Sequence, residues 1–265
     1  MKIVATCAAL AGLAGSARAA SAQTSEQVSE ERQMTLPMGR ALVETFAEIS
    51  LSQDDVGQPI SLAPDIWYGV SEILTIGLVN SGRGATGLLG DTGNGLCLTG
   101  SDNECPKVYN SVGVDGRYHF YRKGEITAAA DGGLYARSID PFALALKFGA
   151  VGRWQEDKLA VEIDPSLFVG LTQRNVGYKE NFFLPMTALY ELSPKLGLAG
   201  QLGIGLPFEN TGDTYQVGIS IGAQYTVSDQ LFADAAFSLP ALLGGDLITN
   251  GFDARTFTLG VGYAL

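Results

Sequence analysis

The sequence predicts an all-β protein, a closed antiparallel transmembrane β-barrel of about twelve strands. Oily residues alternate with small or polar ones along most of the chain from residue 40 to residue 265. The composition agrees, because 34 of the 265 residues are glycine and only 17% are charged. Beyond the N-terminus no run of 18 apolar residues occurs, so a helical membrane span is not expected. Aromatic residues of the oily face gather near strand ends, where amphipathic rings favour the water–lipid interface.

The N-terminus reads as a secretory signal. Residues 1–22 begin with Lys2 and continue as an apolar run that is too short to span a bilayer. Two small-x-small cleavage motifs are present, one that ends at Ala19 and one that ends at Ala22. Cleavage after Ala22 is favoured, and the site after Ala19 stays open. The polar stretch 23–39 lacks any period and is predicted to be a short N-terminal arm.

Charge and cysteine content narrow the function classes. Cleavage would remove Lys2 and Arg18 but none of the 28 acidic residues, which takes the formal charge from −11 to −13. Nucleic acid is therefore not an expected partner, because its binding needs basic patches. Cleavage would also remove Cys7. For an exported chain, the remaining closely spaced pair, Cys97 and Cys105, predicts one disulfide, with two free thiols as the alternative.

Period-two alternation predicts a series of strands within a single domain, residues 40–265. The clearest segment carries Leu159, Val161 and Ile163 on one face and Glu162 and Asp164 on the other. The predicted strands are 40–52, 59–70, 73–81, 108–121, 125–137, 142–154, 158–172, 181–192, 196–206, 214–227, 230–239 and 254–265. Their ends are uncertain by two to four residues.

Connection lengths alternate along the chain. After every even-numbered predicted strand only about two or three turn residues follow, as at 122–124 and 193–195. After odd-numbered strands the connections are longer, up to the Gly-rich stretch 82–107. The assembly therefore has a tight-turn end and a long-loop end. The stretch 82–107 is interpreted as a flexible loop, and both it and the N-terminal arm are candidates to plug the barrel.

The oily face is predicted to point outward to lipid. The other face offers Gly, Ala, Ser and Thr mixed with charge, which makes a poor dry core. An oily exterior on every strand would be an apolar patch that water-soluble monomers avoid. The polar face then lines a lumen. The predicted lumen charges are Glu44, Glu48, Asp65, Asp115, Arg117, Asp131, Arg137, Lys147, Arg153, Glu162, Asp164, Glu191 and Asp234.

Several of these charges are expected to pair across neighbouring strands. Lys147 and Arg153 belong to one strand, and Glu162 and Asp164 to the next, within cross-strand reach. Arg117 is expected near Asp131 in the same way. In contrast, Glu44, Glu48 and Asp65 cluster without a cation between them. These charges either form a transverse field across a pore or are paired because unpaired buried charge is costly.

The C-terminal stretch FTLGVGYAL resembles the last strand of Gram-negative outer-membrane β-barrel proteins, which alternates hydrophobic residues and ends on an aromatic or apolar residue. Leu265 departs from the usual Phe or Trp. The resemblance implies closure against the first strand and recognition by the barrel-assembly machinery. It also implies outer-membrane lipid around the barrel, short turns and the arm 23–39 in the periplasm, and long loops outside.

These features together predict a porin-like channel for small solutes with a weak cation preference. The alternative is a non-conducting structural or adhesion barrel that binds a partner through its outer loops. No enzyme activity, cofactor or metal site is expected. The single histidine, His119, reads as a hydrogen-bonded wall residue, and the acidic loop tips lack the spacing of an EF-hand.

Overall fold

The structure, a computed structural model, describes residues 34–265 except 53–55, 100–107, 177 and 247–250. The predicted signal 1–22 and most of the arm 23–39 lie outside the described residues, as does Cys105. The predicted Cys97–Cys105 disulfide therefore stays a prediction.

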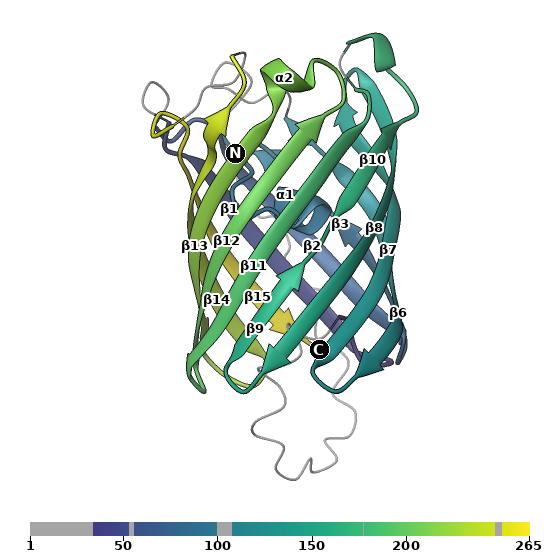
Figure 1. Cartoon of the computed structure of the whole chain (residues 1–265), viewed down its shortest axis with the longest axis vertical. Coiled ribbons are helices and arrows are strands. Elements are labelled where there is room, and N and C mark those ends of the chain that lie inside the picture. Colours follow the sequence, from purple (N-terminus) through teal and green to yellow (C-terminus); the bar gives the residue numbers. More distant parts are fainter. Residues whose placement is uncertain (1–33, 53–55, 100–107, 177, 247–250) are drawn as a thin grey trace, which may run out of the picture.

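The described chain is built almost entirely of strands (Figure 1). The strands are β1 (Ala41–Ser50), β2 (Ile60–Ser71), β3 (Leu74–Val79), β4 (Gly95–Cys97), β5 (Tyr109–Asn110), β6 (Val112–Lys123), β7 (Ile126–Ile139), β8 (Phe142–Glu156), β9 (Leu159–Ile163), β10 (Ser166–Gly170), β11 (Asn181–Ser193), β12 (Leu196–Pro207), β13 (Gln216–Thr226), β14 (Leu231–Gly244) and β15 (Thr256–Ala264). The helical segments are α1 (Gly82–Thr86), η2 (Arg174–Val176) and α2 (Thr211–Thr214). No helix in the described part of the chain has the length and apolar character needed to cross a membrane.

The sheet closes on itself because β1 pairs antiparallel with both β2 and the last strand, β15. At the seam Ala41 N–H donates to Leu265 O and Leu265 N–H donates to Ala41 O. Neighbouring wall strands are antiparallel throughout, which gives a closed 12-strand antiparallel barrel. The predicted fold class is confirmed, and full closure leaves no unpaired sheet edge in lipid.

β9 and β10 together fill one position in the wall. Both pair with β8 on one side and β11 on the other, and the register is the same before and after the break. The break falls at Pro165, whose nitrogen carries no hydrogen for the ladder. The predicted strand 158–172 is thus present, with one interruption.

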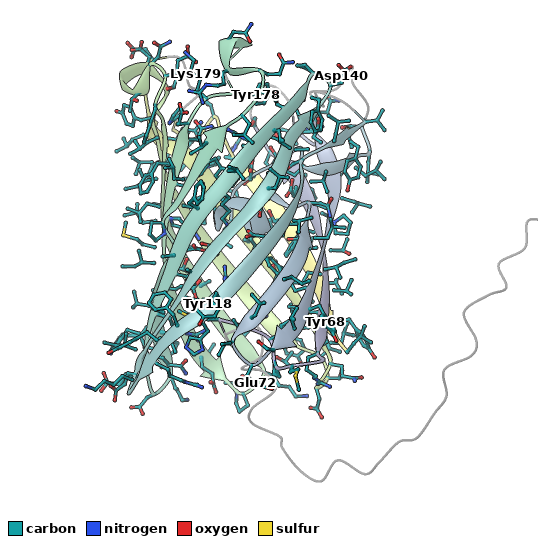
Figure 2. The ribbon with its side chains drawn as sticks, turned by 90° about the vertical axis from the view of Figure 1, so that its right-hand side faces the viewer. Tyr68, Glu72, Tyr118, Asp140, Tyr178 and Lys179 are labelled. Atoms are coloured by element: carbon teal, nitrogen blue, oxygen red, sulfur yellow. The ribbon has the colours of Figure 1, made fainter. Side chains whose placement is uncertain are left out.

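The two faces of the wall separate as the alternation predicts. Ile219 and Val261 are 43% and 53% exposed on the outside, while Ser220 and Thr258, which face inward on the same two strands, are buried. In Figure 2 side chains cover the outer surface, with Tyr68 and Tyr118 near the tight-turn end and Tyr178 near the opposite rim. The apolar outer surface is what a lipid-embedded barrel requires.

Three boundaries differ from the sequence-based prediction. β14 continues to Gly244, five residues beyond the predicted end at 239. The predicted strand 108–121 is split into β5 and β6 at Ser111, whose φ of 58° breaks the extended backbone. The third difference concerns 82–107, which contains α1 and β4 instead of forming one open loop.

Candidate functional site

After β3 the chain leaves the barrel wall, and it returns to the same wall position as β4. β3 pairs with the lower part of β2, where Leu78 faces Ile66. A continuous strand would reach Leu62 with residue 82, but the structure pairs Leu62 with Leu96, so 14 residues are inserted. Because 14 is even, the inside–outside alternation is the same before and after the insertion. The segment 80–94, which contains this insertion, is called the inward excursion below.

Two carboxylates of the wall hold the base of the inward excursion. Asp65 Oδ1 accepts from the backbone N–H groups of Asn80 and Ser81, at 2.7 and 2.9 Å. Asp65 Oδ2 accepts from the Ser81 hydroxyl at 2.5 Å. Glu48 joins both ends of the excursion, since it accepts from Gly82 N–H at 3.2 Å and from Asn94 N–H at 3.0 Å. Both acids are buried, and charge-assisted bonds to backbone donors are strong.

The far part of the excursion reaches the opposite wall. Arg83 Nη1 lies 2.8 Å from Asp234 Oδ1 on β14. Gln201 on β12 donates from Nε2 to Gly87 O at 2.8 Å and accepts from Leu89 N–H at 2.9 Å. The excursion therefore crosses the lumen from β2 to β12 and β14, and α1 lies inside the barrel in Figure 1. This part of the predicted loop 82–107 points inward.

Apolar contacts fix α1 against one side of the lumen. Ala85 belongs to a buried cluster with Val79, Tyr135 and Phe168. The rings of Tyr135 and Phe168 meet edge to face, with centroids 5.2 Å apart. Close-packed side chains of this kind resist displacement, so the excursion is a built part of the lumen. Within the excursion, burial raises the pKa of Asp91 above its ordinary value.

The end of the predicted N-terminal arm also enters the lumen. Met34 packs against the inward-facing Ala129 and Val151 near the tight-turn end. Leu36 N–H donates to Thr75 Oγ1 at 2.7 Å, and Thr35 Oγ1 donates to Glu72 O at 3.2 Å. Residues 34–37 form the N-terminal segment, which together with the excursion occupies part of the lumen. Described parts of both plug candidates named from the sequence, residues 34–37 and 82–94, therefore lie inside the barrel.

A cavity of about 260 Å³ lies between the N-terminal segment and the inward excursion. We call it the chamber. It is lined by side chains from most wall strands, with Leu36 of the N-terminal segment and Arg83 of the excursion. Its charged lining residues are Glu44, Asp65, Arg83, Arg117, Arg153, Glu162, Asp164 and Asp234. Seven of these eight belong to the predicted lumen charges, and the eighth, Arg83, comes from the predicted flexible loop 82–107.

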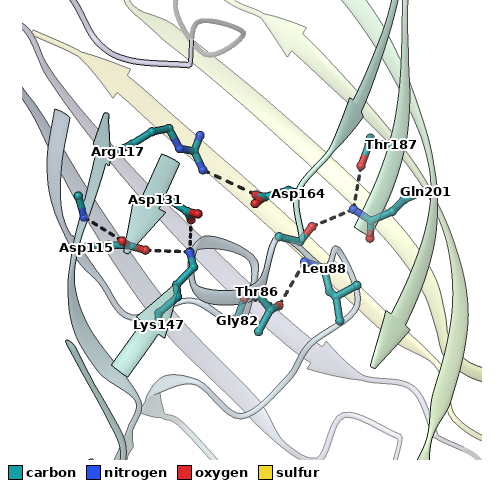
Figure 3. A network of polar contacts seen from close by, with 12 residues as sticks. Gly82, Thr86, Leu88, Asp115, Arg117, Asp131, Lys147, Asp164, Thr187 and Gln201 are labelled. Carbon is teal, nitrogen blue, oxygen red and sulfur yellow. Dashed lines mark hydrogen bonds and ion pairs between the residues drawn. The ribbon is translucent and has the colours of Figure 1, made fainter. Parts of the chain in front are cut away.

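One buried cluster joins three lumen charges in a way that differs from the expected pairing. Lys147 Nζ lies 2.9 Å from Asp115 Oδ2 and 2.6 Å from Asp131 Oδ2 (Figure 3). Tyr135 donates its hydroxyl to Asp115 at 2.6 Å. The expected partners of Lys147 were Glu162 and Asp164. Lys147 reaches Asp115 instead because Gly133 lies between them in the register and has no side chain in the way.

The remaining basic lumen charges also have specific neighbours. Arg117 Nη2 lies 3.7 Å from Asp164 Oδ2, although Asp131 is its direct register partner. Arg153 faces Glu162 in register, as expected, and donates to Gln155 Oε1 at 3.0 Å. The Arg137 guanidinium lies over the ring of Phe168, 5.8 Å from its centroid.

Three predicted acids, Glu44, Glu191 and Asp234, complete the set. Glu44 and Asp234 are buried chamber residues, and Glu44 is the register partner of Asp65. Glu191 is half-buried on β11. His119, outside this set, has Nε2 2.9 Å from Tyr121 O. Glu48 and Asp65, predicted as part of an acidic cluster, have backbone N–H groups of the excursion as hydrogen-bond partners.

Several large inward side chains lie flat against a glycine of the neighbouring strand. The direct register pairs are Trp67–Gly77, Tyr135–Gly113, Phe183–Gly205 and Phe232–Gly262. A Cβ at Gly77 would lie 2.3 Å from Cε3 of Trp67, and one at Gly262 would lie 1.9 Å from Phe232. These glycines let the rings lie along the wall, which leaves the centre to the excursion and the chamber.

The Gly77→Ala substitution is expected to push the Trp67 ring away from the wall. Overpacking of this kind should lower the free energy of unfolding by about 1–3 kcal/mol. Urea unfolding measures the stability, and Trp67 emission in a Trp154→Phe background reports the ring's surroundings. Gly152→Ala on β8 is the matched control, because a Cβ there meets nothing within 4 Å. Equal stability and emission for both variants would contradict the expected displacement.

Solved structures with a similar fold include two porins. The NanC porin superposes with a TM-score of 0.60 at 10% identity, covering 84% of this chain and 100% of that chain. The KdgM porin does so with a TM-score of 0.56 at 10% identity, covering 84% and 98%. A KdgM porin described as in complex with disordered oligogalacturonate gives 0.55 at 9% identity, with the same coverage. No protein-family model and no curated protein sequence matches the chain.

Proposed function

We propose, on the premise that the chain has the fold of outer-membrane β-barrel porins, that it is a channel for small solutes with a weak preference for cations. The chamber carries this proposal, since a cavity of about 260 Å³ lined by charged side chains remains inside a filled barrel. The inward excursion narrows the path, so it would set the size limit for solutes. Lipid of the outer membrane surrounds the barrel in this proposal.

The balance of lumen charge supports the cation preference. With Arg40 included, the polar face carries nine acids and five bases, and the excursion adds Arg83 and Asp91, one of each sign. Some of this charge is offset locally, because Lys147 lies between Asp115 and Asp131. A negative surplus in a low-dielectric pore attracts cations, and a partly compensated one does so weakly.

Planar bilayers test the conduction and the selectivity separately. Refolded protein should give steady single-channel current, and a KCl gradient should give a reversal potential of the cation-selective sign, well short of the ideal value. Slower gel mobility after boiling, compared with the unboiled sample, shows beforehand that the barrel has folded. Clear anion selectivity would refute the charge argument while leaving the channel in place.

The second candidate is a non-conducting barrel that binds a partner through its outer loops. The observation that favours it is the double filling of the lumen by the N-terminal segment and the inward excursion. Folded protein that inserts into bilayers but passes no current would support this candidate and exclude the first.

Further parts of the proposal concern export and assembly. We propose that residues 1–22 are a signal removed after Ala22, and that Cys97 and Cys105 form a disulfide in the exported chain. The strand that ends at Leu265 would be read by the barrel-assembly machinery. We propose no enzymatic role. Peptide mapping with and without reductant tests both the cleavage site and the disulfide.

A further inference from the structure

We propose that the chamber binds small zwitterions, solutes that carry one carboxylate and one ammonium group as free amino acids do. This inference rests on the proposed channel function for its biological meaning, but the binding itself is testable without conduction. The observation behind it is a cavity lined by two pairs of opposite charge, in which buried atoms of Arg117, Asp164 and Asp234 have no hydrogen-bond partner among the described residues.

One side of the chamber carries the pair Arg117 and Asp164. Their nearest atoms are 3.7 Å apart, which is longer than a hydrogen bond, so the contact is electrostatic only (Figure 3). Arg117 Nε and Asp164 Oδ1 have no hydrogen-bond partner in the described part of the chain. Asp164 is 9% exposed. A donor and an acceptor are therefore both unused at the same place, and buried polar atoms normally have a partner.

The other side carries Arg83 and Asp234. Arg83 Nη1 bonds one carboxylate oxygen of Asp234 at 2.8 Å. The second oxygen, Asp234 Oδ2, has no hydrogen-bond partner among the described residues, and Asp234 is 8% exposed. β14 and β6, which carry Asp234 and Arg117, are far apart in the strand order around the barrel. The lining of the chamber thus offers a guanidinium beside a carboxylate at two separate places.

Charge balance favours a zwitterion over a simple ion at these places. In each pair a guanidinium and a carboxylate offset one another, so the pairs have little net charge to hold an ion. An ammonium group of a ligand can pair with the carboxylate of Asp164 or Asp234, while a ligand carboxylate can pair with the Arg117 guanidinium, whose side chain is 26% exposed. Both are charge-assisted bonds, roughly twice as strong as those of a neutral solute.

Size and apolar lining restrict the solute further. The volume of about 260 Å³ is just below the usual range for ligand pockets. Trp67 and Phe46 also line the chamber, so a short apolar side chain of the solute can pack against them. Small amino acids fit both limits.

Trp67 provides a direct readout of binding. The chain has two tryptophans, and Trp154 lies on the outer face at 36% exposure, so Trp154→Phe leaves Trp67 as the only indole. Detergent-folded protein is titrated with L-alanine, L-lactate and isopropylamine, which share a carbon frame and differ in charge. We expect L-alanine to give a saturable change in Trp67 emission with at least tenfold lower half-saturation than either of the others.

A double variant tests the residues. Arg117→Gln with Asp164→Asn removes both charges and keeps polar side chains of similar size, and it should raise the half-saturation for L-alanine at least tenfold. Arg174→Gln on the outer rim is the matched control, since it removes one guanidinium that is paired with Glu180 away from the chamber. Heat-modifiable mobility on a gel verifies that each variant is folded.

The outcomes separate this inference from the proposed function. Binding of L-alanine without any current would sink the channel and leave the zwitterion site standing. Current together with half-saturations that follow net charge alone, isopropylamine first and L-lactate last, would overturn the zwitterion site and leave the channel. No saturable response to L-alanine would also overturn it, as would an unchanged response in the double variant.

Discussion

Removal of the inward excursion is expected to raise single-channel conductance several-fold. Deleting residues 81–94 joins Asn80 to Gly95 and removes the 14 inserted residues. Leu96 then continues the β3 register opposite Leu62, where it already pairs. The deletion therefore restores an uninterrupted wall strand, and water fills the space that α1 occupied.

The same deletion should strengthen the cation preference. Glu48 loses the N–H groups of Gly82 and Asn94, and Asp65 loses both donors of Ser81, so two carboxylates become more available to ions in the lumen. The loss of Arg83 and Asp91 removes one charge of each sign and leaves the total unchanged. The reversal potential in a KCl gradient measures this shift in the same bilayers as the conductance.

A deletion on the outer rim serves as the control. Gly212 and Asp213 lie in α2, outside the lumen, and their removal should leave conductance near that of the parent protein. If the folded excursion variant conducts no better than this control, the excursion does not limit the path. A gain in conductance without any change in selectivity would show that Glu48 and Asp65 lie away from the ion path.

The fold was predictable because a strand has only two phases. The alternation at Leu159, Val161 and Ile163 assigns a whole strand to one face, and lipid or lumen is then the only choice left. The small and charged residues of the other face indicate that it lines the lumen, so the oily face is assigned to lipid. The same reasoning assigns the charged wall residues that line the chamber to the polar face of their strands.

The excursion was hidden for the same physical reason. An even insertion of 14 residues keeps the phase of the strand, so the alternation before and after it gives no sign of an interruption. One sign of the excursion in the sequence was that Glu48 and Asp65 are predicted to face inward without a cation between them. Buried carboxylates need donors, and the base of the excursion supplies them as backbone N–H groups.

The charge partners were only partly predictable, because alternation gives the face of a residue but not the direction of a long side chain. Lys147 crosses the bare backbone of Gly133 to reach Asp115, two strands away. Arg117 bypasses its register partner Asp131 and approaches Asp164. Glycine positions in the lumen therefore hold information about pairing that a count of charges does not use.

Lys147→Met is expected to lower the free energy of unfolding by about 3–5 kcal/mol. The Lys147 side chain is 3% exposed, and the side chains of its two partners, Asp115 and Asp131, are each 1% exposed. Without the ammonium group, two neighbouring carboxylates remain buried with no cation between them. Tyr135 still donates to Asp115 but adds no positive charge.

The triple variant Lys147→Met, Asp115→Asn, Asp131→Asn separates lost charge balance from lost packing. It removes all three charges and keeps similar side-chain volumes, so most of the stability should return, because replacing a whole buried ion cluster is often near neutral. Urea titration of refolded protein, followed by gel mobility, gives the two midpoints. If the triple variant is as unstable as Lys147→Met, the loss comes from packing of the Lys147 stem and the electrostatic account fails. If Lys147→Met unfolds at the parent's midpoint, water in the lumen already solvates both acids.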